Sequence, residues 1–434
     1  MTQNRTRCRW SGRLDTWEAW LAVWVPRILM FFPVVDYGLR LAPITPLGMV
    51  WDKCALLALG WVAVRRHRRG LRPPRQAWWF QAVWFLVFVI ARAASGASDF
   101  NVALAGTGFY IYYLLFAFVL PYAVKPAEVP RLLHLLAGTA VLIGLHAVYQ
   151  YVIAVPIPAD WTDLSQHVRT RVFSVLRSPN ELGSYMALMT PLLAGMAIGE
   201  KGPWRRAFYG GGSIVCAIAM ILTFTRGAWV GLAGALLLSA LLFERRLLIP
   251  LLGLGAIGFL APGVHSRVQA LFTQVYWMKS ADSGRIAKWL SAFDHMSTNP
   301  LLGVGVGHYG GAVATAHHFS MYSDNFYAKT LGEVGIVGLI LFFAMHLSLL
   351  VDLILTVRRA DFPARYVFLG ATTGILAVLI HNGMENVFEY APMAMSYFTI
   401  ATLTMIAGST VREGQYASSA GKDVPAQERT PIHS

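Results

Sequence analysis

Apolar runs of about 20 residues, separated by short polar stretches, fill most of the chain. A helix of that length crosses the hydrocarbon core of a bilayer. The pattern predicts an all-α polytopic membrane protein with about twelve transmembrane helices, near residues 17–35, 41–64, 77–95, 102–123, 132–155, 179–199, 207–224, 227–243, 247–260, 331–357, 366–384 and 391–407. We expect residues 1–410 to form one integral membrane domain and residues 411–434 a polar tail, disordered from Arg412.

Two long polar segments interrupt this pattern, near residues 156–178 and 265–330. The second holds Ser283-Gly284-Arg285, an amphipathic run through Met296 and the pair Asp324-Asn325. In a chain this apolar, a polar segment is where aqueous chemistry can occur. We therefore predict that this loop contains short helices, lies over the outer membrane surface and carries half of an active site.

Basic residues cluster in the short loops, at positions 5–13, 65–75, 125–131, 201–206, 245–246 and 358–365. Twelve spans would place all six clusters and both termini on one side of the membrane. By the positive-inside rule that side is the cytoplasm, so both long loops would face outside. The formal net charge of +14 is then a signal of topology and does not indicate a nucleic-acid partner.

Composition agrees with this interpretation, since only 13% of residues are charged whereas soluble domains have about 25%. The three cysteines, Cys8, Cys54 and Cys216, lack metal-ligand spacing and lie outside the long loops, so neither zinc nor a disulfide is expected. The basic residues from Arg5 to Arg13 precede a first apolar run with no cleavage site after it, which predicts a retained anchor.

Two arginines are the first candidates for function. Arg226 lies between two spans with almost no loop, where an arginine is costly unless it is paired or faces water. The alternative is snorkelling, with Trp229 as an interface anchor. Arg285 falls in the first turn of a predicted helix capped by Ser283, where a cation opposes the helix dipole. Free N–H groups and an arginine there suit phosphate oxygens, although contact with lipid headgroups is the simpler explanation.

The stretch Ser178-Pro179-Asn180-Glu181 has the pattern of a capping box with proline at the first helical position. We interpret Glu181 as structural. Three arginines just before it, Arg169, Arg171 and Arg177, lie in a predicted outer loop and would add positive field there.

Several residues could act as a general base. Asp324 is one, with helix capping as the alternative. His317, His318 and His381 are further candidates, and His381, Glu385 and Glu389 are spaced to share one helix face, where one could be a base or hold an acceptor sugar. This spacing is a weak metal signal, and no metal is predicted. The glycines from Gly303 to Gly307 follow Asn-Pro rather than a strand, so they do not form a dinucleotide loop.

Arginines, a carboxylate and histidines over a membrane cavity suit glycosyl transfer from a lipid-diphosphate donor. The leaving diphosphate supplies the driving force, so no cofactor is required. A flippase or transporter of a lipid-linked glycan is the alternative, and a non-catalytic scaffold is the third hypothesis. Transporters place ionisable residues near the midplane, whereas these lie at helix ends, which favours an enzyme.

The same residues lie in stretches that resemble the O-antigen ligase and O-antigen polymerase family of bacterial membrane glycosyltransferases. The resemblance covers about Arg171 to Leu341 and rests on five stretches: Ser178-Pro179-Asn180-Glu181-Leu182, Thr223-Phe224-Thr225-Arg226-Gly227-Ala228-Trp229, Ser283-Gly284-Arg285 with Trp289, Asn299-Pro300-Leu301-Leu302-Gly303-Val304-Gly305, and Asp324-Asn325-Phe326-Tyr327 with Glu333-Val334-Gly335-Ile336-Val337-Gly338. Each is short, but their order and spacing are fairly specific.

The resemblance implies a GT-C-type fold in the bacterial inner membrane, with a glycan donor on undecaprenyl diphosphate and a glycan, lipid-linked or lipid A core acceptor outside. It implies that Arg226 and Arg285 bind the diphosphate. Ligases of the family typically carry a histidine where this chain has Asp324, an aspartate that can still act as the base of an inverting transfer. We expect Asp324, Arg285 and Arg226 to be catalytic, and Arg177, Asn325 and His381 to help bind substrate, in a polymerase or a ligase.

Overall fold

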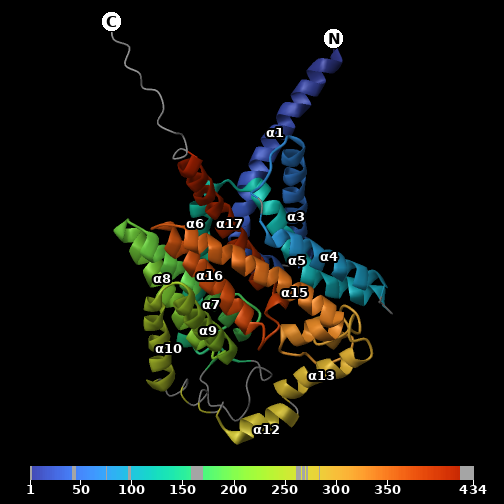
Figure 1. The fold of residues 1–434 in the computed structure, drawn as a ribbon, viewed down its shortest axis with the longest axis vertical. Helices are drawn as coiled ribbons and strands as arrows, with labels where there is room; N and C mark the ends of the chain where they lie inside the picture. The colour runs from blue at the N-terminus through green and yellow to red at the C-terminus, as the bar shows by residue number, and fades with distance from the viewer. Residues whose placement is uncertain are drawn as a thin grey trace.

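The computed structural model describes residues 2–41, 45–74, 76–95, 99–157, 170–260, 265, 269, 272–282 and 284–420. Within these ranges the chain is almost entirely helical and has no strand (Figure 1). Ser283 and Arg169, singled out above, lie outside the described residues, as do residues 421–434.

Every predicted apolar run forms a helix. They are α1 (Thr2–Leu29) with α2 (Phe32–Leu41), α3 (Thr45–Arg68), α4 (Trp78–Ser95), α5 (Phe100–Ala123), α6 (Val129–Val152), α7 (Pro179–Gly199), α8 (Pro203–Leu222), α9 (Arg226–Leu242), α10 (Leu248–Leu260), α15 (Phe326–Arg359), α16 (Ala364–His381) and α17 (Ala391–Ala420). The 3-10 turns η1 (Pro126–Glu128), η3 (Arg245–Leu247) and η4 (Val387–Glu389) join some of them. The long polar loop contains α12 (Gln274–Asp282), α13 (Arg285–Ser297) and α14 (Ala312–Ala316), as predicted.

The predicted number of spans is not confirmed. Among the described residues, 9 helices are long and apolar enough to cross a membrane, or up to 10 if α1 and α2, bent by 82°, form one span. The two other apolar helices are shorter: α9 has 17 residues and α10 has 13. At about 1.5 Å per residue, α10 falls short of a hydrocarbon core about 30 Å thick. The all-α polytopic class is thus confirmed, whereas the count of twelve is not.

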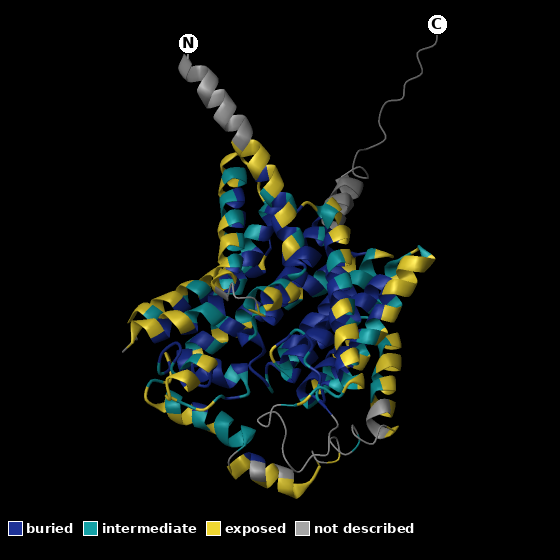
Figure 2. Ribbon diagram, turned by 180° about the vertical axis from the view of Figure 1, so that it is seen from behind, coloured by how far each residue is buried: buried dark blue, intermediate teal, exposed yellow. Residues whose placement is uncertain are grey.

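Helices α7, α16 and α17 form the centre of the bundle, because most of their residues in the apolar spans are buried. Buried positions lie toward the middle of the molecule and exposed ones along its periphery (Figure 2). Many peripheral residues are large and apolar, among them Leu57, Phe80 and Trp84. Such a surface requires a lipid environment, because soluble proteins rarely expose so much apolar area.

The two ends of the bundle differ. The start of α1 and the last turns of α17 lie at one end, and α12 and α13 lie at the other (Figure 1). We call these the termini end and the loop end. Helix α17 continues to Ala420. The expectation of disorder from Arg412 is therefore wrong as far as Ala420.

Helix α15 is broken near its start, which ties the long loop to it. Gly335 has φ +67° inside the helix, and a Cβ there would lie 2.5 Å from the carbonyl carbon of Leu301. The freed backbone groups pair with the loop: Val304 N–H donates to Gly332 O and Ile336 N–H to Pro300 O. Two of the short family-like motifs, the Asn-Pro turn and the Glu-Val-Gly stretch, thus pack against each other.

Candidate active site at the loop end

Four of the helices that begin at the loop end carry the polar residues of the site in their first turns. Helix α7 follows the N-cap Ser178, α9 follows Thr225, α13 follows Gly284 and α15 follows Asn325. Each N-terminus brings unsatisfied N–H groups and a positive partial charge. Arg226 and Arg285 are the first residues of α9 and α13, so two cations sit where the helix dipole disfavours them.

Arg171 joins the start of α7 to the turn between α8 and α9. Its guanidinium donates to Thr223 O at 3.0 Å, Thr225 Oγ1 at 3.3 Å and Asn180 Oδ1 at 3.2 Å. Burial lowers the pKa of Arg171 to about 10; the carboxylate of Glu385 opposes this, and the positive charges of Arg285 and Arg226 add to it. Three arginines and a carboxylate therefore act on one another here.

Asp324 faces the cations of α13 from the start of α15. Its Oδ2 lies 3.0 Å from Lys288 Nζ and 3.8 Å from Arg285 Nε, and all three side chains are partly exposed. Asp324 has φ +52°, a left-handed conformation in which aspartate is enriched relative to most residues. The adjacent Asn325 is the helix cap, since its Oδ1 accepts from Tyr327 N–H and Ala328 N–H.

Glu385 is the second carboxylate at these arginines, and it is buried. Asn180 Nδ2 donates to Glu385 Oε2, which connects it to Arg171 through the same amide group. Burial raises the pKa of Glu385 to about 7; the negative charge of Asp324 adds to this, and Arg285 opposes it. The two carboxylates thus differ in their surroundings. Asp324 forms ion pairs with Lys288 and Arg285, whereas Glu385 is buried.

His381 lies at the end of α16, close to the start of α9. Its Nδ1 is 2.7 Å from Ser184 Oγ, and a Cβ on Gly227 would come within 2.5 Å of its Nε2. The imidazole is buried and fills the place next to Arg226 that a larger residue at 227 would need.

Other candidates are placed apart from the arginines or used otherwise. Arg177 lines a separate cavity near α2. Half of the predicted capping box is confirmed, since Ser178 Oγ accepts from Glu181 N–H at 3.2 Å. Glu181 Oε2 accepts at 2.9 Å from the N–H of Arg177, the residue before the cap, rather than from Ser178 N–H. His317 and His318 are exposed beyond α14.

The expected shared face of His381, Glu385 and Glu389 is wrong, because α16 ends at His381 and the two glutamates lie in the turn beyond it. Among the described residues no group of three or more His, Cys, Asp or Glu side chains could hold a metal ion.

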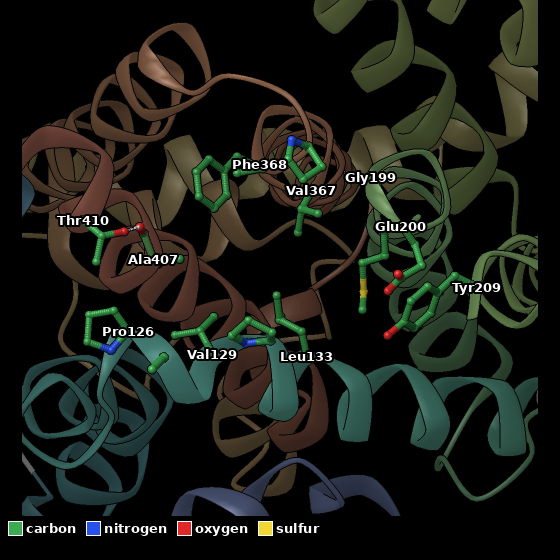
Figure 3. Close-up of a pocket in the computed structure, with 15 residues that line it drawn as sticks. Pro126, Val129, Leu133, Gly199, Glu200, Tyr209, Val367, Phe368, Ala407 and Thr410 are labelled. Atoms are coloured by element: carbon green, nitrogen blue, oxygen red, sulfur yellow. Dashed lines mark hydrogen bonds between the residues drawn. The ribbon is translucent and has the colours of Figure 1, made fainter. Parts of the chain in front are cut away.

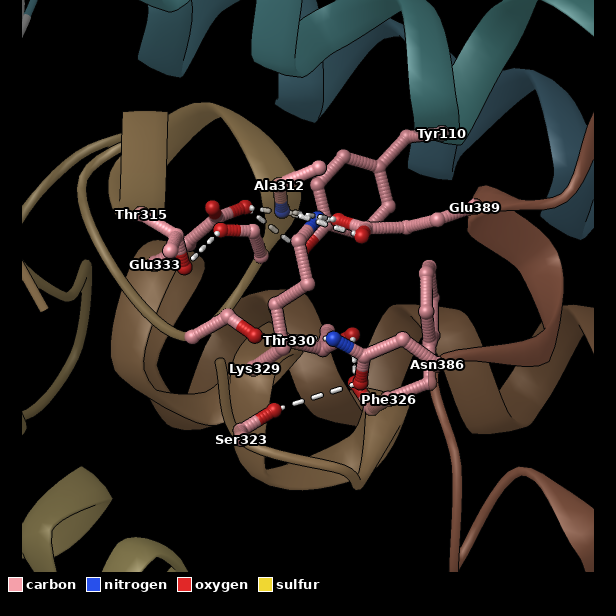
Figure 4. A network of polar contacts seen from close by, with 12 residues as sticks. Tyr110, Ala312, Thr315, Ser323, Phe326, Lys329, Thr330, Glu333, Asn386 and Glu389 are labelled. Carbon is pink, nitrogen blue, oxygen red and sulfur yellow. Dashed lines mark hydrogen bonds and ion pairs between the residues drawn. The ribbon is translucent and has the colours of Figure 1, made fainter. Parts of the chain in front are cut away.

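A buried ionic network holds the long loop in place (Figure 4). Lys329 Nζ lies 3.2 Å from Glu333 Oε2 and 3.4 Å from Glu389 Oε1, and all three side chains are almost fully buried. Tyr110 OH donates to Glu333 at 2.8 Å, and Ala312 N–H donates to Glu389 at 3.0 Å. The network thus joins α5, α15, the loop and η4.

The two residues before η4, Glu385 and Asn386, form hydrogen bonds that connect this network to the arginines. Asn386 Nδ2 donates to Gly310 O at 2.8 Å, and its Oδ1 accepts from Asn325 N–H at 3.1 Å. Glu385 on one side of it reaches Asn180, and Glu389 beyond it reaches Lys329. From α4, Arg92 adds hydrogen bonds to Leu302 O and Gly303 O. This framework ties the start of α15, next to Asp324, to the long loop and to α7.

Sequence reasoning named Arg171 and Glu385 without ranking them, and it did not single out Lys329, Asn386 or Arg92. For Lys329 and Arg92 the sequence does contain a signal of a buried partner, because a cation within or next to an apolar span needs one. For Asn386 the sequence gives no comparable signal.

A large apolar cavity of about 520 Å³ lies at the termini end, away from these residues (Figure 3). It is lined by the beginnings of α6, α8 and α16 and the end of α7, and Glu200 is its only charged lining residue in the described chain. We do not include it in the site.

Comparison with known proteins bears on the same segment. The model of a family described as O-antigen ligase matches residues 211–343, which include Arg226, Arg285, Asp324 and the break at Gly335. A search of curated proteins gave no match. The predicted resemblance to the O-antigen ligase and polymerase family is confirmed, because residues 211–343 match the family model.

Proposed function

We propose that the protein is an inverting glycosyltransferase that moves a glycan from undecaprenyl diphosphate to a sugar hydroxyl on the outer face of the bacterial inner membrane. The observation that carries this proposal is the gathering of Arg171, Arg226 and Arg285 opposite two carboxylates at the loop end. The family match supports a surface-polysaccharide polymerase or ligase.

The arginines are suited to the donor diphosphate. Guanidinium groups bind phosphate oxygens through paired hydrogen bonds, and helix N-termini favour the same anion. Arg226 and Arg285 are both first residues of their helices, so donor binding would neutralise charges that repel each other and the helix dipoles. As the glycosidic bond breaks, the growing negative charge on the diphosphate would be stabilised by the same groups.

The proton of the acceptor requires a base, and we propose Glu385. In the reaction the acceptor oxygen attacks the anomeric carbon, the bond to the diphosphate breaks and the diphosphate leaves with the electron pair. The acceptor proton passes to a carboxylate. Asp324 remains a candidate for this role, but Lys288 and Arg285 already stabilise its charge. Glu385 is buried with a pKa of about 7, near the value at which a general base works best at neutral pH.

The donor-binding role predicts the effect of two substitutions. Arg226→Ala and Arg285→Ala should each lower transfer by about 100-fold or more, in line with losses of single groups that stabilise transition-state charge. Both proteins should still insert into the membrane and keep the wild-type melting temperature. Arg205→Ala, an exposed arginine at the termini end, is the matched control and should transfer normally.

The decisive assay uses purified protein with undecaprenyl-diphosphate-linked oligosaccharide as the only substrate. A ladder of lengthened lipid-linked glycan would identify a polymerase. Transfer only after addition of a lipid A core or other glycan acceptor would identify a ligase. The absence of product under both conditions would contradict the proposal and favour a flippase of the lipid-linked glycan. So would a wild-type amount of product from both arginine variants.

A further inference from the structure

A second cavity, of about 240 Å³, lies at the beginning of α7. It is enclosed by α2, the beginning of α7 and the start of α17, and its lining includes two carboxylates and two arginines: Asp36, Arg40, Arg177 and Glu181. Ligand pockets for drug-sized molecules are usually about 300 Å³ or larger, so this one fits a smaller ligand such as one sugar ring.

The carboxylates of this cavity differ in how they are satisfied. Both oxygens of Asp36 have donors, Arg40 Nε at 2.8 Å and Trp51 Nε1 at 3.3 Å. Glu181 is fully buried, and only its Oε2 has a hydrogen bond, from Arg177 N–H. Its Oε1 has no hydrogen-bond partner among the described residues. Leaving a buried carboxylate oxygen without a donor is unfavourable, so a ligand that supplies one would be stabilised.

The capping role of Glu181 explains one of its oxygens but not the other. A glutamine would cap α7 equally well, because one amide oxygen can accept from Arg177 N–H. The charge on Glu181 instead faces a cavity in which Arg40 and Arg177 act on it as well. The arginines can donate to ring and hydroxyl oxygens, while Tyr37 at the cavity wall offers an aromatic surface.

The cavity adjoins the proposed reaction centre through successive residues of α7. Asn180 donates to Glu385 in the site, and the next residue, Glu181, lines the cavity. Tyr390 is close enough to both Glu181 and Glu385 to interact with their charges. A sugar in the cavity would therefore contact the same first turn of α7 that carries Asn180, the hydrogen-bond partner of Glu385.

We propose that this cavity binds one sugar ring of the acceptor glycan, with a hydroxyl group donating to Glu181 Oε1 and further oxygens accepting from Arg40 and Arg177. The proposal rests on the proposed glycosyl transfer for its biological meaning, but the binding itself does not depend on activity.

The first test measures binding. Saturation-transfer NMR would be recorded on the purified protein in detergent with four methyl pyranosides, those of glucose, galactose, mannose and N-acetylglucosamine. Glu181→Gln preserves the cap and should weaken binding of the preferred pyranoside about tenfold or more, the usual loss for a hydrogen bond to a charged group. Arg177→Gln, at an exposed side chain, should weaken it as well. Glu200→Gln, a carboxylate at the termini-end cavity, is the matched control and should bind normally.

The second test measures kinetics in the transfer assay. Glu181→Gln should raise the KM for the acceptor about tenfold and leave the KM for the donor unchanged. If pyranoside binding depends on Glu181 but the protein shows no glycosyl transfer, the proposed sugar site is supported and the proposed function fails. If Glu181→Gln transfers glycan with an unchanged KM for the acceptor, the proposed sugar site is overturned and the proposed function stands. No binding of any pyranoside to the wild-type protein, or equal binding by Glu181→Gln, would also overturn it and point to water at Glu181.

Discussion

At the scale of single residues, the site combines groups whose environments differ although their chemistry is the same. Asp324 and Glu385 are both carboxylates near Arg285, yet one is partly exposed and ion-paired while the other is buried. Placing two carboxylates close together while burying one pushes their proton affinities apart. Such a pair can divide two tasks, holding the cations of α13 and accepting a proton.

This difference predicts a pH profile. A base with a pKa of about 7 is protonated at lower pH, so transfer should fall as the pH drops through about 7 and level off above it. Glu385→Gln should lower kcat by about 100-fold or more and abolish that acidic limb. The measurement is kcat of the wild-type protein and of Glu385→Gln between pH 5 and 9, a range of about two units on either side of the pKa.

Asp324→Asn is the matched control, because asparagine also adopts the left-handed conformation found at this position. It should retain the acidic limb. A profile that persists in Glu385→Gln and vanishes in Asp324→Asn would assign the proton to Asp324 instead.

At the scale of elements, the site depends on how the long loop is attached to α15. The break at Gly335 frees backbone groups that pair with the Asn-Pro turn, and Lys329 lies almost two turns before it in the helix. Lys329 is also within 4.3 Å of the centre of the Tyr110 ring, so α5 contributes to its environment. These contacts hold α15 and the loop together, and α13, with Arg285, packs against α15.

Removing Lys329 should destabilise this attachment. Lys329→Met leaves Glu333 and Glu389 buried without their cation, and breaking a buried ion pair in this way costs about 3–5 kcal/mol. We expect a clearly lower melting temperature in detergent and loss of transfer. Lys53→Met, which removes an exposed lysine paired with Asp52, should cost less than about 1 kcal/mol. Equal melting temperatures for the two variants would contradict a structural role for the network.

At the scale of the whole molecule, the two ends of the bundle have separate characters. The loop end gathers the arginines and carboxylates, and the termini end carries basic loop residues around an apolar cavity. Because basic loops favour the cytoplasm, we propose that the loop end faces outside. An enzyme with that orientation would meet its donor after the glycan has crossed the membrane.

Cysteine labelling tests this orientation. In a variant lacking Cys8, Cys54 and Cys216, a cysteine at Ser297, exposed at the end of α13, should react with a membrane-impermeant maleimide in spheroplasts. A cysteine at Lys201, exposed between α7 and α8, should react only after the membrane is permeabilised. The reverse pattern would invert the topology and would rule out chemistry on the outer face.

The sequence by itself determined the membrane class and the order of helices, and it singled out Arg226 and Arg285 as candidates for function. These follow from local signals: the length of apolar runs, the position of charges between them and the cap residues at helix starts. The helix cap at Ser178 and the amphipathic helix after Gly284 are local in the same sense, and both are present in the structure.

Only the tertiary structure decided which polar groups meet. Glu385 is hydrogen-bonded to Asn180, which lies 205 residues earlier in the sequence, and Lys329 is paired from η4 as well as from its own helix. The predicted helix through His381, Glu385 and Glu389 ends early, so these residues diverge toward Ser184, Asn180 and Lys329. Apolar periodicity specifies that a helix forms, but burial and pairing of charges depend on neighbours distant in sequence, which no local pattern contains.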